Sequence, residues 1–144
     1  IKLLERLREE ESGVYGVGAR GSTSKYPQPR YSLQISFGTS IEKYPSLIKS
    51  ALDEVQKIKT DGPSQADLDK FLIEQRRQLE LQLKENNFWL SHINSSYQLN
   101  EDPAAILRKL EELNKITVES VQKVANKYLL QDRLFESILL PEAK

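Results

Sequence analysis

Residues 8–15 read Arg-Glu-Glu-Glu-Ser-Gly-Val-Tyr, and they mark a junction between a charged helix and a strand. Arg8 lies near the end of residues 1–11, which are dense in Leu, Glu and Arg and have high helix propensity. Gly13 allows the backbone to turn sharply, and Tyr15 begins a segment typical of a strand. The junction therefore delivers a guanidinium and a phenol, both hydrogen-bond donors, toward one place.

The residues after this junction predict two strands. Residues 14–20 favour a strand, whereas residues 21–29 are rich in Gly, Ser, Thr and Pro, which is typical of a loop. In residues 30–37 apolar and polar side chains alternate, which is the period of a half-buried strand. We expect the two strands to pair as an antiparallel hairpin with a long loop.

The rest of the chain is mostly helical. Four helices are expected to begin near Thr39 or Ser40, at Ser64, at Asp102-Pro103 and at Thr117. The second of these opens with a capping box of Ser64 and Asp67 and runs to about Lys84, and residues 133–140 return to strand character. This order predicts an α+β fold with an antiparallel sheet packed against several helices, in a single domain over residues 1–144.

Composition limits the classes of partner. The 144 residues contain 21 Lys and Arg against 21 Asp and Glu, and no basic block stands out. This balance argues against nucleic acid or an anionic membrane as the main partner. No apolar run approaches the roughly 18 to 20 residues of a membrane span. The absence of cysteine excludes disulfides and thiolate metal sites. Because the chain opens on Ile1 within a helical pattern, we expect it to be part of a longer protein.

Gly16, Gly18 and Gly21 match the spacing G-x-G-x-x-G of dinucleotide-binding loops. Such a site requires the glycines to close a strand and open a helix that holds the pyrophosphate. Here a Ser-, Thr- and Pro-rich segment follows, without a helical pattern. The glycines therefore indicate close approach of a neighbouring backbone within a strand.

Other candidate residues favour structural roles. His92 is the single histidine and has no further ligands at a spacing that suits zinc. Glu9, Glu10 and Glu11 are successive helical residues, which point about 100° apart and do not converge on a metal. The aromatic residues near His92 are interpreted as core or subunit-contact residues: Phe88, Trp89 and Tyr97.

Arg8 and Tyr15 have two interpretations. In the structural interpretation, Arg8 pairs with neighbouring glutamates and Tyr15 packs against the sheet. In the functional interpretation, both side chains remain available to bind a carbonyl oxygen. The residues alone leave both open.

A wider resemblance bears on this choice. Residues 7–17, from Leu-Arg-Glu to Ser-Gly-Val-Tyr-Gly-Val, resemble a junction in the C-terminal half of insulinase/pitrilysin-type zinc peptidases. Four further segments resemble later elements of that half, in the same order: residues 35–39, 62–64, 116–129 and 137–141. The family is built around an inverted His-x-x-Glu-His zinc motif, which this chain lacks. The resemblance is thus to the half that does not hold zinc.

This resemblance implies a fold, a site and partners. The fold would be part of a metallohydrolase-like, or processing-peptidase-like, sandwich domain. Zinc would be held by a homologous half, in the same chain or in a partner subunit, and the substrate would be a peptide or an unfolded protein. Tyr15 would donate a hydrogen bond to the substrate oxygen that becomes negative, and Arg8 would bind a neighbouring substrate carbonyl. The chain alone is expected to be inactive.

Two alternatives accompany this hypothesis. The parent protein could be a family member that has lost catalysis and serves as a structural or assembly subunit. The chain could also be an unrelated α+β interaction domain. A location in the bacterial periplasm is an expectation that rests on the family only.

Overall fold

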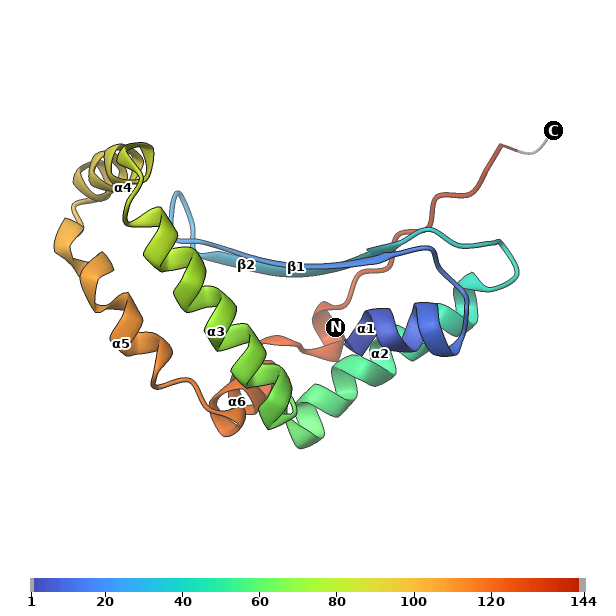
Figure 1. Cartoon of the computed structure of the whole chain (residues 1–144). Coiled ribbons are helices and arrows are strands. Elements are labelled where there is room, and N and C mark those ends of the chain that lie inside the picture. The colour runs from blue at the N-terminus through green and yellow to red at the C-terminus, as the bar shows by residue number, and fades with distance from the viewer. Residues whose placement is uncertain (1, 143–144) are drawn as a thin grey trace. The chain divides into compact units, whose positions relative to one another are not determined.

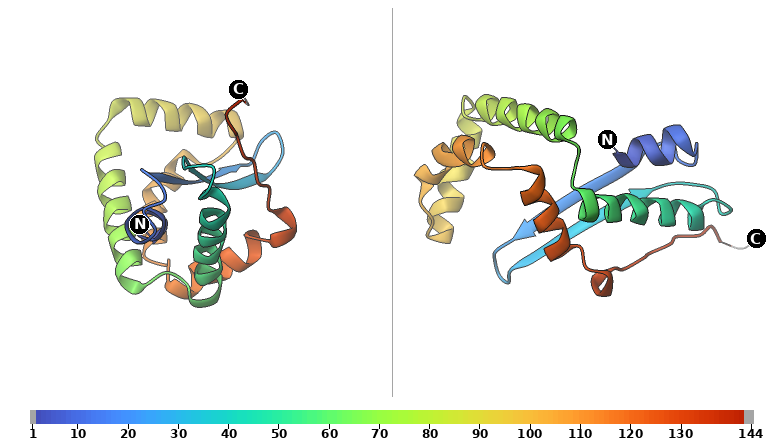
Figure 2. Two further views of the ribbon diagram at one scale, coloured as in Figure 1. Left: turned by 90° about the vertical axis from the view of Figure 1, so that its right-hand side faces the viewer. Right: turned by 90° about the horizontal axis from the view of Figure 1, so that it is seen from below.

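The computed structural model describes residues 2–142 (Figures 1 and 2). Its contacts divide these residues into two compact units. Unit 1 contains the residues up to Gly62 together with those from Gln122 onward, and unit 2 contains Pro63–Val121. The expectation of a single domain over residues 1–144 stays a prediction.

Unit 1 consists of a hairpin, two neighbouring helical segments and the end of a third helix. Its elements are α1 (Lys2–Leu4), the π-helical η1 (Glu5–Glu10), β1 (Val17–Ser24), β2 (Arg30–Phe37), α2 (Tyr44–Asp61), the later part of α6 (Val118–Tyr128) and the 3₁₀ turn η3 (Gln131–Arg133). Strands β1 and β2 pair antiparallel in a register that runs from Val17 opposite Phe37 to Ser24 opposite Arg30. The predicted hairpin and the bounds of its second strand are confirmed.

The first strand lies further along the chain than expected. β1 begins at Val17 and continues to Ser24, through the small residues that were expected to form a loop. Residues 21–24 enter the ladder because residues 30–33 of β2 offer them backbone partners. Pairing therefore overrides the low strand propensity of Gly and Ser.

The core of unit 1 lies between the hairpin and its helices. Leu7 of η1, Val14, and Leu47 and Ala51 of α2 are buried together. The inner face of the hairpin covers them with Val17, Ile35 and Phe37, while Leu3 packs beside them. Figure 1 shows α1 and α2 on the same side of the hairpin. The α+β class, with an antiparallel sheet packed on helices, is confirmed.

Helix α2 begins later than expected, at Tyr44 rather than near Thr39 or Ser40. Pro45 lies in its first turn, where a missing N–H costs nothing, and residues 41–43 form a turn before it. The helix ends as expected, because Gly62 adopts φ 74° and donates its N–H to the carbonyl of Ile58 at 3.0 Å.

Unit 2 is helical. It contains α3 (Gln65–Gln82), α4 (Asn86–Leu99), the 3₁₀ segment η2 (Pro103–Arg108), α5 (Lys109–Leu113) and the first residues of α6. The expected cap of α3 at Ser64 is present, since the hydroxyl of Ser64 accepts from the N–H of Asp67 at 3.1 Å. The carboxylate of Asp102 likewise accepts from the N–H of Ala104 at the start of η2. No helix among residues 2–142 combines the length and apolar character that crossing a bilayer requires.

The strand expected at residues 133–140 is absent from the structure. The chain passes from η3 into residues 134–142, which have no regular secondary structure. A strand needs a neighbour that satisfies its N–H and C=O groups, and within residues 2–142 β1 and β2 pair only with each other. The apolar pattern of these residues therefore forms no ladder here.

Candidate functional site

The structure brings Arg8 and Tyr15 together. The guanidinium carbon of Arg8 lies 5.7 Å from the centre of the Tyr15 ring, a distance typical of a cation–π contact. Arg8 is exposed, and 92% of the Tyr15 side chain is accessible to solvent. The two residues predicted as a pair thus form one, at the surface of unit 1.

The position of Arg8 follows from the π-helical segment that carries it. In η1 the N–H of Glu11 donates to the carbonyl of Arg6 at 3.2 Å, five residues back. Leu7 is completely buried, and its carbonyl accepts from the N–H of Gly13 at 3.0 Å. Since Leu7 anchors this turn in the core, the next residue, Arg8, is directed outward.

The turn between Arg8 and Tyr15 depends on Ser12 and Gly13 in different ways. Ser12 adopts φ 47°, so the left-handed residue is the serine and not the glycine. Gly13 is required by packing instead, because a Cβ at this position would lie 2.5 Å from Cδ2 of Leu47. The expectation that Gly13 makes the turn by its backbone conformation is therefore wrong. Gly13 is needed because it lies in close contact with α2.

This turn is held by the side chains of Thr39, which precedes α2, and Lys43, which lies at the start of α2. The hydroxyl of Thr39 donates to the carbonyl of Gly13 at 2.6 Å, and Nζ of Lys43 donates to the carbonyl of Ser12 at 3.2 Å. Beyond the turn, Val14 is buried, and the chain bends at Tyr15, whose side chain is exposed. The position of Tyr15 is thus fixed by the core through its neighbours.

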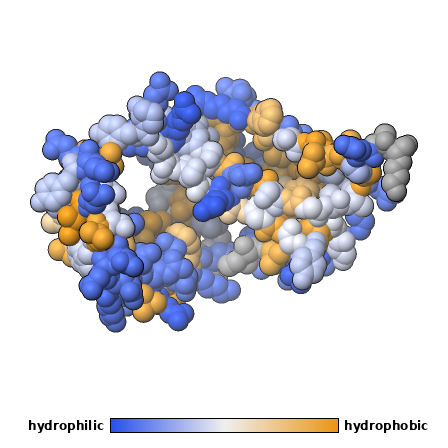
Figure 3. All heavy atoms as spheres, turned by 90° about the horizontal axis from the view of Figure 1, so that it is seen from above, coloured by the Kyte–Doolittle hydropathy of each residue, from blue (hydrophilic) through white to orange (hydrophobic). Residues whose placement is uncertain are grey.

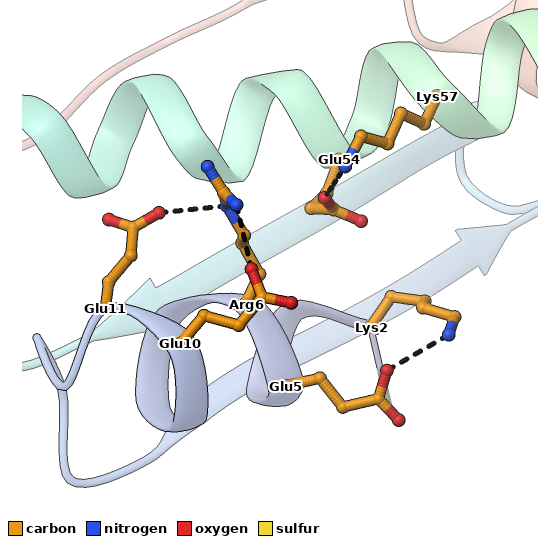
Figure 4. Close-up of polar contacts among 7 residues, drawn as sticks. All are labelled: Lys2, Glu5, Arg6, Glu10, Glu11, Glu54 and Lys57. Carbon is orange, nitrogen blue, oxygen red and sulfur yellow. Dashed lines mark hydrogen bonds and ion pairs between the residues drawn. The ribbon is translucent and has the colours of Figure 1, made fainter.

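The structural interpretation of this pair does not hold in the structure. Within the described part of the chain, neither Arg8 nor Tyr15 makes a hydrogen bond or an ion pair. Arg6 takes the neighbouring glutamates instead, with Nη1 2.8 Å from Glu10 and Nε 2.9 Å from Glu11 (Figure 4). The guanidinium of Arg8 and the hydroxyl of Tyr15 therefore donate to none of the described residues.

The Arg6 cluster also links η1 to α2 electrostatically. The hydrogen bond to Glu10 raises the pKa of Arg6 above its ordinary value, and the charges of Glu11, Glu10 and Glu54 act in the same direction. Glu54 is a buried residue of α2 whose carboxylate lies 2.5 Å from Nζ of Lys57 (Figure 4). Arg6 therefore remains cationic beside Glu10 and Glu11.

His92 takes the structural role expected of it, whereas the expected close approach of a neighbouring backbone is absent at Gly16 and Gly21, where a Cβ would meet nothing within 4 Å. Nε2 of His92 lies 2.8 Å from the carbonyl of Pro103, and the ring stacks on Phe88 with centres 6.0 Å apart. A carbonyl accepts only, so Nε2 carries the proton. Gly18 and Gly21 lie inside β1, which is followed by a loop and β2 rather than by a helix. A Cβ at Gly18 would lie 3.3 Å from Oγ of Ser36 on the paired strand.

The described residues do not fit a zinc ion. Across residues 2–142 no three His, Cys, Asp or Glu side chains gather closely enough to hold a metal. An open depression of about 320 Å³ lies between η1 and α2, but Arg8 and Tyr15 do not line it. Its walls carry opposite charges and polar groups: Arg6, Asp53, Gln56, Lys57, Thr60 and Asp61.

Comparison with known families identifies the chain. The family model described as "Peptidase M16 inactive domain" matches residues 1–72, which is half of the chain and includes η1, the turn, the hairpin and α2. The chain belongs to the peptidase M16 family. The predicted resemblance to insulinase/pitrilysin-type zinc peptidases is thereby confirmed.

Curated relatives of this M16 chain carry zinc-protease names. It is 28% identical over 138 residues to "Probable zinc protease PqqL" of Escherichia coli K12, covering 94% of this chain and 15% of the relative. It is 28% identical over 102 residues to "Zinc protease PQQL-like" of Arabidopsis thaliana, covering 67% of this chain and 11% of the relative. The chain therefore spans only a small part of the relatives it matches.

Solved structures agree with the fold. The periplasmic protease PqqL of Escherichia coli superposes with a TM-score of 0.72 at 27% identity, covering 89% of this chain and 14% of that one. A protease from Helicobacter pylori superposes with a TM-score of 0.73 at 20% identity, covering 90% of this chain and 30% of that one. The second likeness shows the fold alone.

Sequence reasoning missed the residues that position the pair. Thr39, Lys43 and Leu47 lie far from Arg8 and Tyr15 in the chain, and no local pattern connects them with the turn. The only signal was the Gly-Thr pair after the second strand, which belongs to the resemblance but does not reveal that Thr39 binds the carbonyl of Gly13.

Proposed function

We propose that this M16 chain is the substrate-binding part, without the zinc site, of a longer zinc metalloendopeptidase. We call this longer protein the parent. Its Arg8 and Tyr15 donate hydrogen bonds to backbone carbonyls of a bound peptide. One observation carries the proposal: both side chains lie together at the surface, and neither uses its donors on the described residues.

The backbone around the pair supports this role. A π-helical turn and a left-handed non-glycine residue are both uncommon, and such features gather at functional sites. Here both occur within the stretch that carries Arg8 and Tyr15, at η1 and at Ser12. Buried Leu7 and Val14 hold this backbone, so the donors are positioned before a substrate arrives.

The two residues have different tasks in this proposal. The Tyr15 hydroxyl donates to the carbonyl oxygen that gains negative charge as the peptide bond is attacked, where removing one donor costs about 10²–10³ in rate in other enzymes. The guanidinium of Arg8 binds an adjacent carbonyl and sets the register of the peptide. Zinc, held outside this chain, supplies the Lewis-acid chemistry when bound.

The partners and the location follow from the same proposal. The zinc-bearing partner is a homologous half, in the parent chain or in another subunit, and the substrate is a peptide or unfolded protein. The likeness to the periplasmic protease PqqL of Escherichia coli supports a periplasmic location for the parent. The alternative is a catalytically inactive parent with an assembly role, and the experiment described next distinguishes it from an active peptidase.

The test is peptide hydrolysis by the zinc-loaded parent carrying Tyr15→Phe. The substitution removes one hydroxyl and keeps the ring beside Arg8, so we expect kcat to fall about tenfold or more at unchanged zinc content. Tyr26→Phe is the matched control, because Nζ of Lys25 lies 5.3 Å from the centre of that ring in a similar contact. Unchanged turnover in Tyr15→Phe contradicts the role of Tyr15, and no turnover in the wild type favours the inactive alternative.

The substitution Arg8→Lys tests whether binding depends on the positive charge of Arg8 or on the geometry of its hydrogen-bond donors. Lysine keeps the cation but lacks the fork of donors that arginine offers to carbonyl groups. We expect KM to rise several-fold with a smaller change in kcat, because the register contact forms already in the bound ground state. An equal fall in kcat and kcat/KM would assign Arg8 to the transition state instead.

A further inference from the structure

The hairpin of β1 and β2 differs in charge from the rest of the chain. Residues 12–41 contain no Asp or Glu, although the whole sequence has 21 acidic residues among 144. The same stretch contains three basic residues, Arg20, Lys25 and Arg30, and two of them, Arg20 and Arg30, lie in the paired strands. The hairpin therefore carries a net positive charge within a chain whose overall charge is zero.

The register places both arginines on the face of the hairpin that points away from the core. Val17, Ile35 and Phe37 pack on the core, so the alternate positions of each strand form the opposite, outer face. Besides Arg20 and Arg30, this outer face consists of small or uncharged polar residues: Gly18, Ser22, Ser24, Ser32, Gln34 and Ser36. All eight residues are exposed, so no other part of unit 1 covers them.

Cross-strand pairing leaves both arginines without an acid. An acid directly opposite an arginine would stabilise the sheet, but Gln34 lies opposite Arg20 and Ser24 lies opposite Arg30. Among the described residues Arg20 makes no hydrogen bond or ion pair, and the hydrogen bond of Arg30 to Oε1 of Gln28 is 3.5 Å long. The positive charge of the outer face is therefore not compensated within the described part of the chain.

We propose that the outer face of the hairpin binds an acidic segment of the peptide substrate, and that Arg20 and Arg30 are specificity-determining residues. This inference rests on the proposed peptidase function and adds the substrate class, which is a polypeptide with Asp or Glu near the cleaved bond. Guanidinium groups bind carboxylates through paired N–H donors, and the serine hydroxyls between the two arginines are further donors.

The chain geometry allows one peptide to reach both sites. Arg20 follows Tyr15 by five residues, so their Cα atoms lie at most about 18 Å apart. Ser24, which pairs with Arg30, is four residues beyond Arg20, or about 13 Å further along the strand. An extended peptide held at Tyr15 spans both distances with about ten residues. The acidic contact then forms on a peptide that is already bound, at a high effective concentration.

Other anionic partners match the outer face less well. Nucleic acid is bound by cations that neutralise several phosphates and, in single strands, by aromatic side chains that stack on the bases. An interfacial membrane contact adds apolar side chains that insert among the lipids. The outer face has two cations, no aromatic residue and no large apolar residue. Figure 3, which views the molecule from the side away from α1 and α2, shows hydrophilic and near-neutral residues beside scattered hydrophobic ones.

Two labelled peptides test the inference in the zinc-loaded, full-length parent. They share one cleavable core and differ only in a flanking segment, which alternates Ser with Glu in one peptide and Ser with Gln in the other. Fluorescence anisotropy, read before measurable hydrolysis, gives the affinity for each peptide. We expect the wild type to bind the Glu peptide about fivefold or more tightly than the Gln peptide. The double variant Arg20→Gln/Arg30→Gln should bind the two peptides about equally.

A second double variant controls for net charge. Lys49→Gln/Lys123→Gln also removes two exposed cations from unit 1, on α2 and α6, and should keep the wild-type preference. A charge-reversed variant separates loss of binding from loss of fold. Arg20→Glu/Arg30→Glu should prefer a third peptide, with Lys in place of Glu, and a misfolded protein cannot produce such a reversed preference.

The other outcomes are equally specific. Equal affinity of the wild type for the Glu and Gln peptides overturns the inference, whether the outer face is covered in the parent or does not select acids. An equal loss of preference in the two Gln variants overturns it as well, because net charge then explains binding. Tighter binding of a single-stranded DNA oligonucleotide, lost in Arg20→Gln/Arg30→Gln, reassigns the face to nucleic acid. A preserved preference in binding without hydrolysis of either peptide supports the acid-binding face and contradicts the proposed peptidase function.

Discussion

Gly13 lies against the buried side chain of Leu47, and this contact sets the distance between the turn and α2. A methyl group at Gly13 would fall 2.5 and 2.7 Å from the two Cδ atoms of Leu47. Leu47 is 1% exposed and has little space into which to move. The backbone that carries Tyr15 would therefore have to shift.

Gly13→Ala should destabilise the protein and displace Tyr15. Overpacking of a filled core costs about 1–3 kcal/mol, so we expect a loss of that size in the free energy of unfolding by urea denaturation. Gly16→Ala is the matched control, because a Cβ at Gly16 meets nothing within 4 Å. In a Leu47→Ala background the cost of Gly13→Ala should largely disappear, and full additivity of the two substitutions would contradict the proposed clash.

Thr39→Val should loosen the turn while preserving side-chain shape. It removes the hydroxyl that donates to the carbonyl of Gly13 at 2.6 Å, and the net cost is about 1 kcal/mol. If the hydrogen bond positions Tyr15, kcat of the parent should fall several-fold, and Thr39→Ser should restore it. A loss of stability in Thr39→Ser without a loss in Thr39→Val would show instead that packing of the methyl group is what matters.

At the scale of single residues, sequence reasoning found the Arg8–Tyr15 pair but not its support. Both residues flank a local junction, and local patterns are readable in sequence. The contact of Gly13 with Leu47 and the bond from Thr39 depend on how the chain folds back on itself. Attributing the turn to Gly13 was wrong for this reason: φ preferences favour glycine, but here packing requires it and Ser12 takes the left-handed conformation.

At the scale of elements, α2 and α6 are joined by several polar side chains. Nδ2 of Asn126 donates to the carbonyl of Lys59 at 2.6 Å, and the side chain of Gln122 donates to the carbonyl of Thr60. In return, Nζ of Lys59 donates to the carbonyl of Leu129 at 2.9 Å. The last carbonyls of a helix lack partners within it, so α6 completes the end of α2.

Asn126→Ala tests this connection. The substitution leaves the carbonyl of Lys59 without its side-chain donor, and we expect a loss of about 0.5–1.5 kcal/mol in the free energy of unfolding. Lys123→Ala is the control on the same helix, because Lys123 makes no hydrogen bond or ion pair with any residue that the structure describes. Equal effects of the two substitutions would mean that helix propensity, and not the carbonyl contact, dominates.

Elements were predictable where their signals are local and were missed where they need a partner. Gly62 predicted where α2 ends, and Ser64 predicted where α3 begins. The alternation in residues 30–37 gave β2 its bounds. Residues 133–140 have an equally apolar pattern, but a strand exists only beside another strand, and sequence alone does not supply the neighbour.

At the scale of the whole molecule, the proposed substrate-binding donors Arg8 and Tyr15 stand apart from any cluster of metal ligands among the described residues. The single histidine is held by Phe88 and the carbonyl of Pro103, and residues 2–142 gather no three potential ligands. Zinc that completes a site stabilises the folded state by mass action, so removing it lowers stability. The isolated 144-residue chain should therefore show the same melting temperature with and without EDTA.

The same chain should not hydrolyse peptides with added zinc, whereas an active parent should lose activity on chelation and regain it with zinc. The physical reason is that Arg8 and Tyr15 can stabilise a carbonyl oxygen but offer no means of activating water. Peptide hydrolysis and zinc content measured by mass spectrometry check both statements on the same preparation. One tightly bound zinc per isolated chain would contradict this division of labour. Zinc-dependent cleavage that is lost on His92→Ala would in addition place a metal site within unit 2.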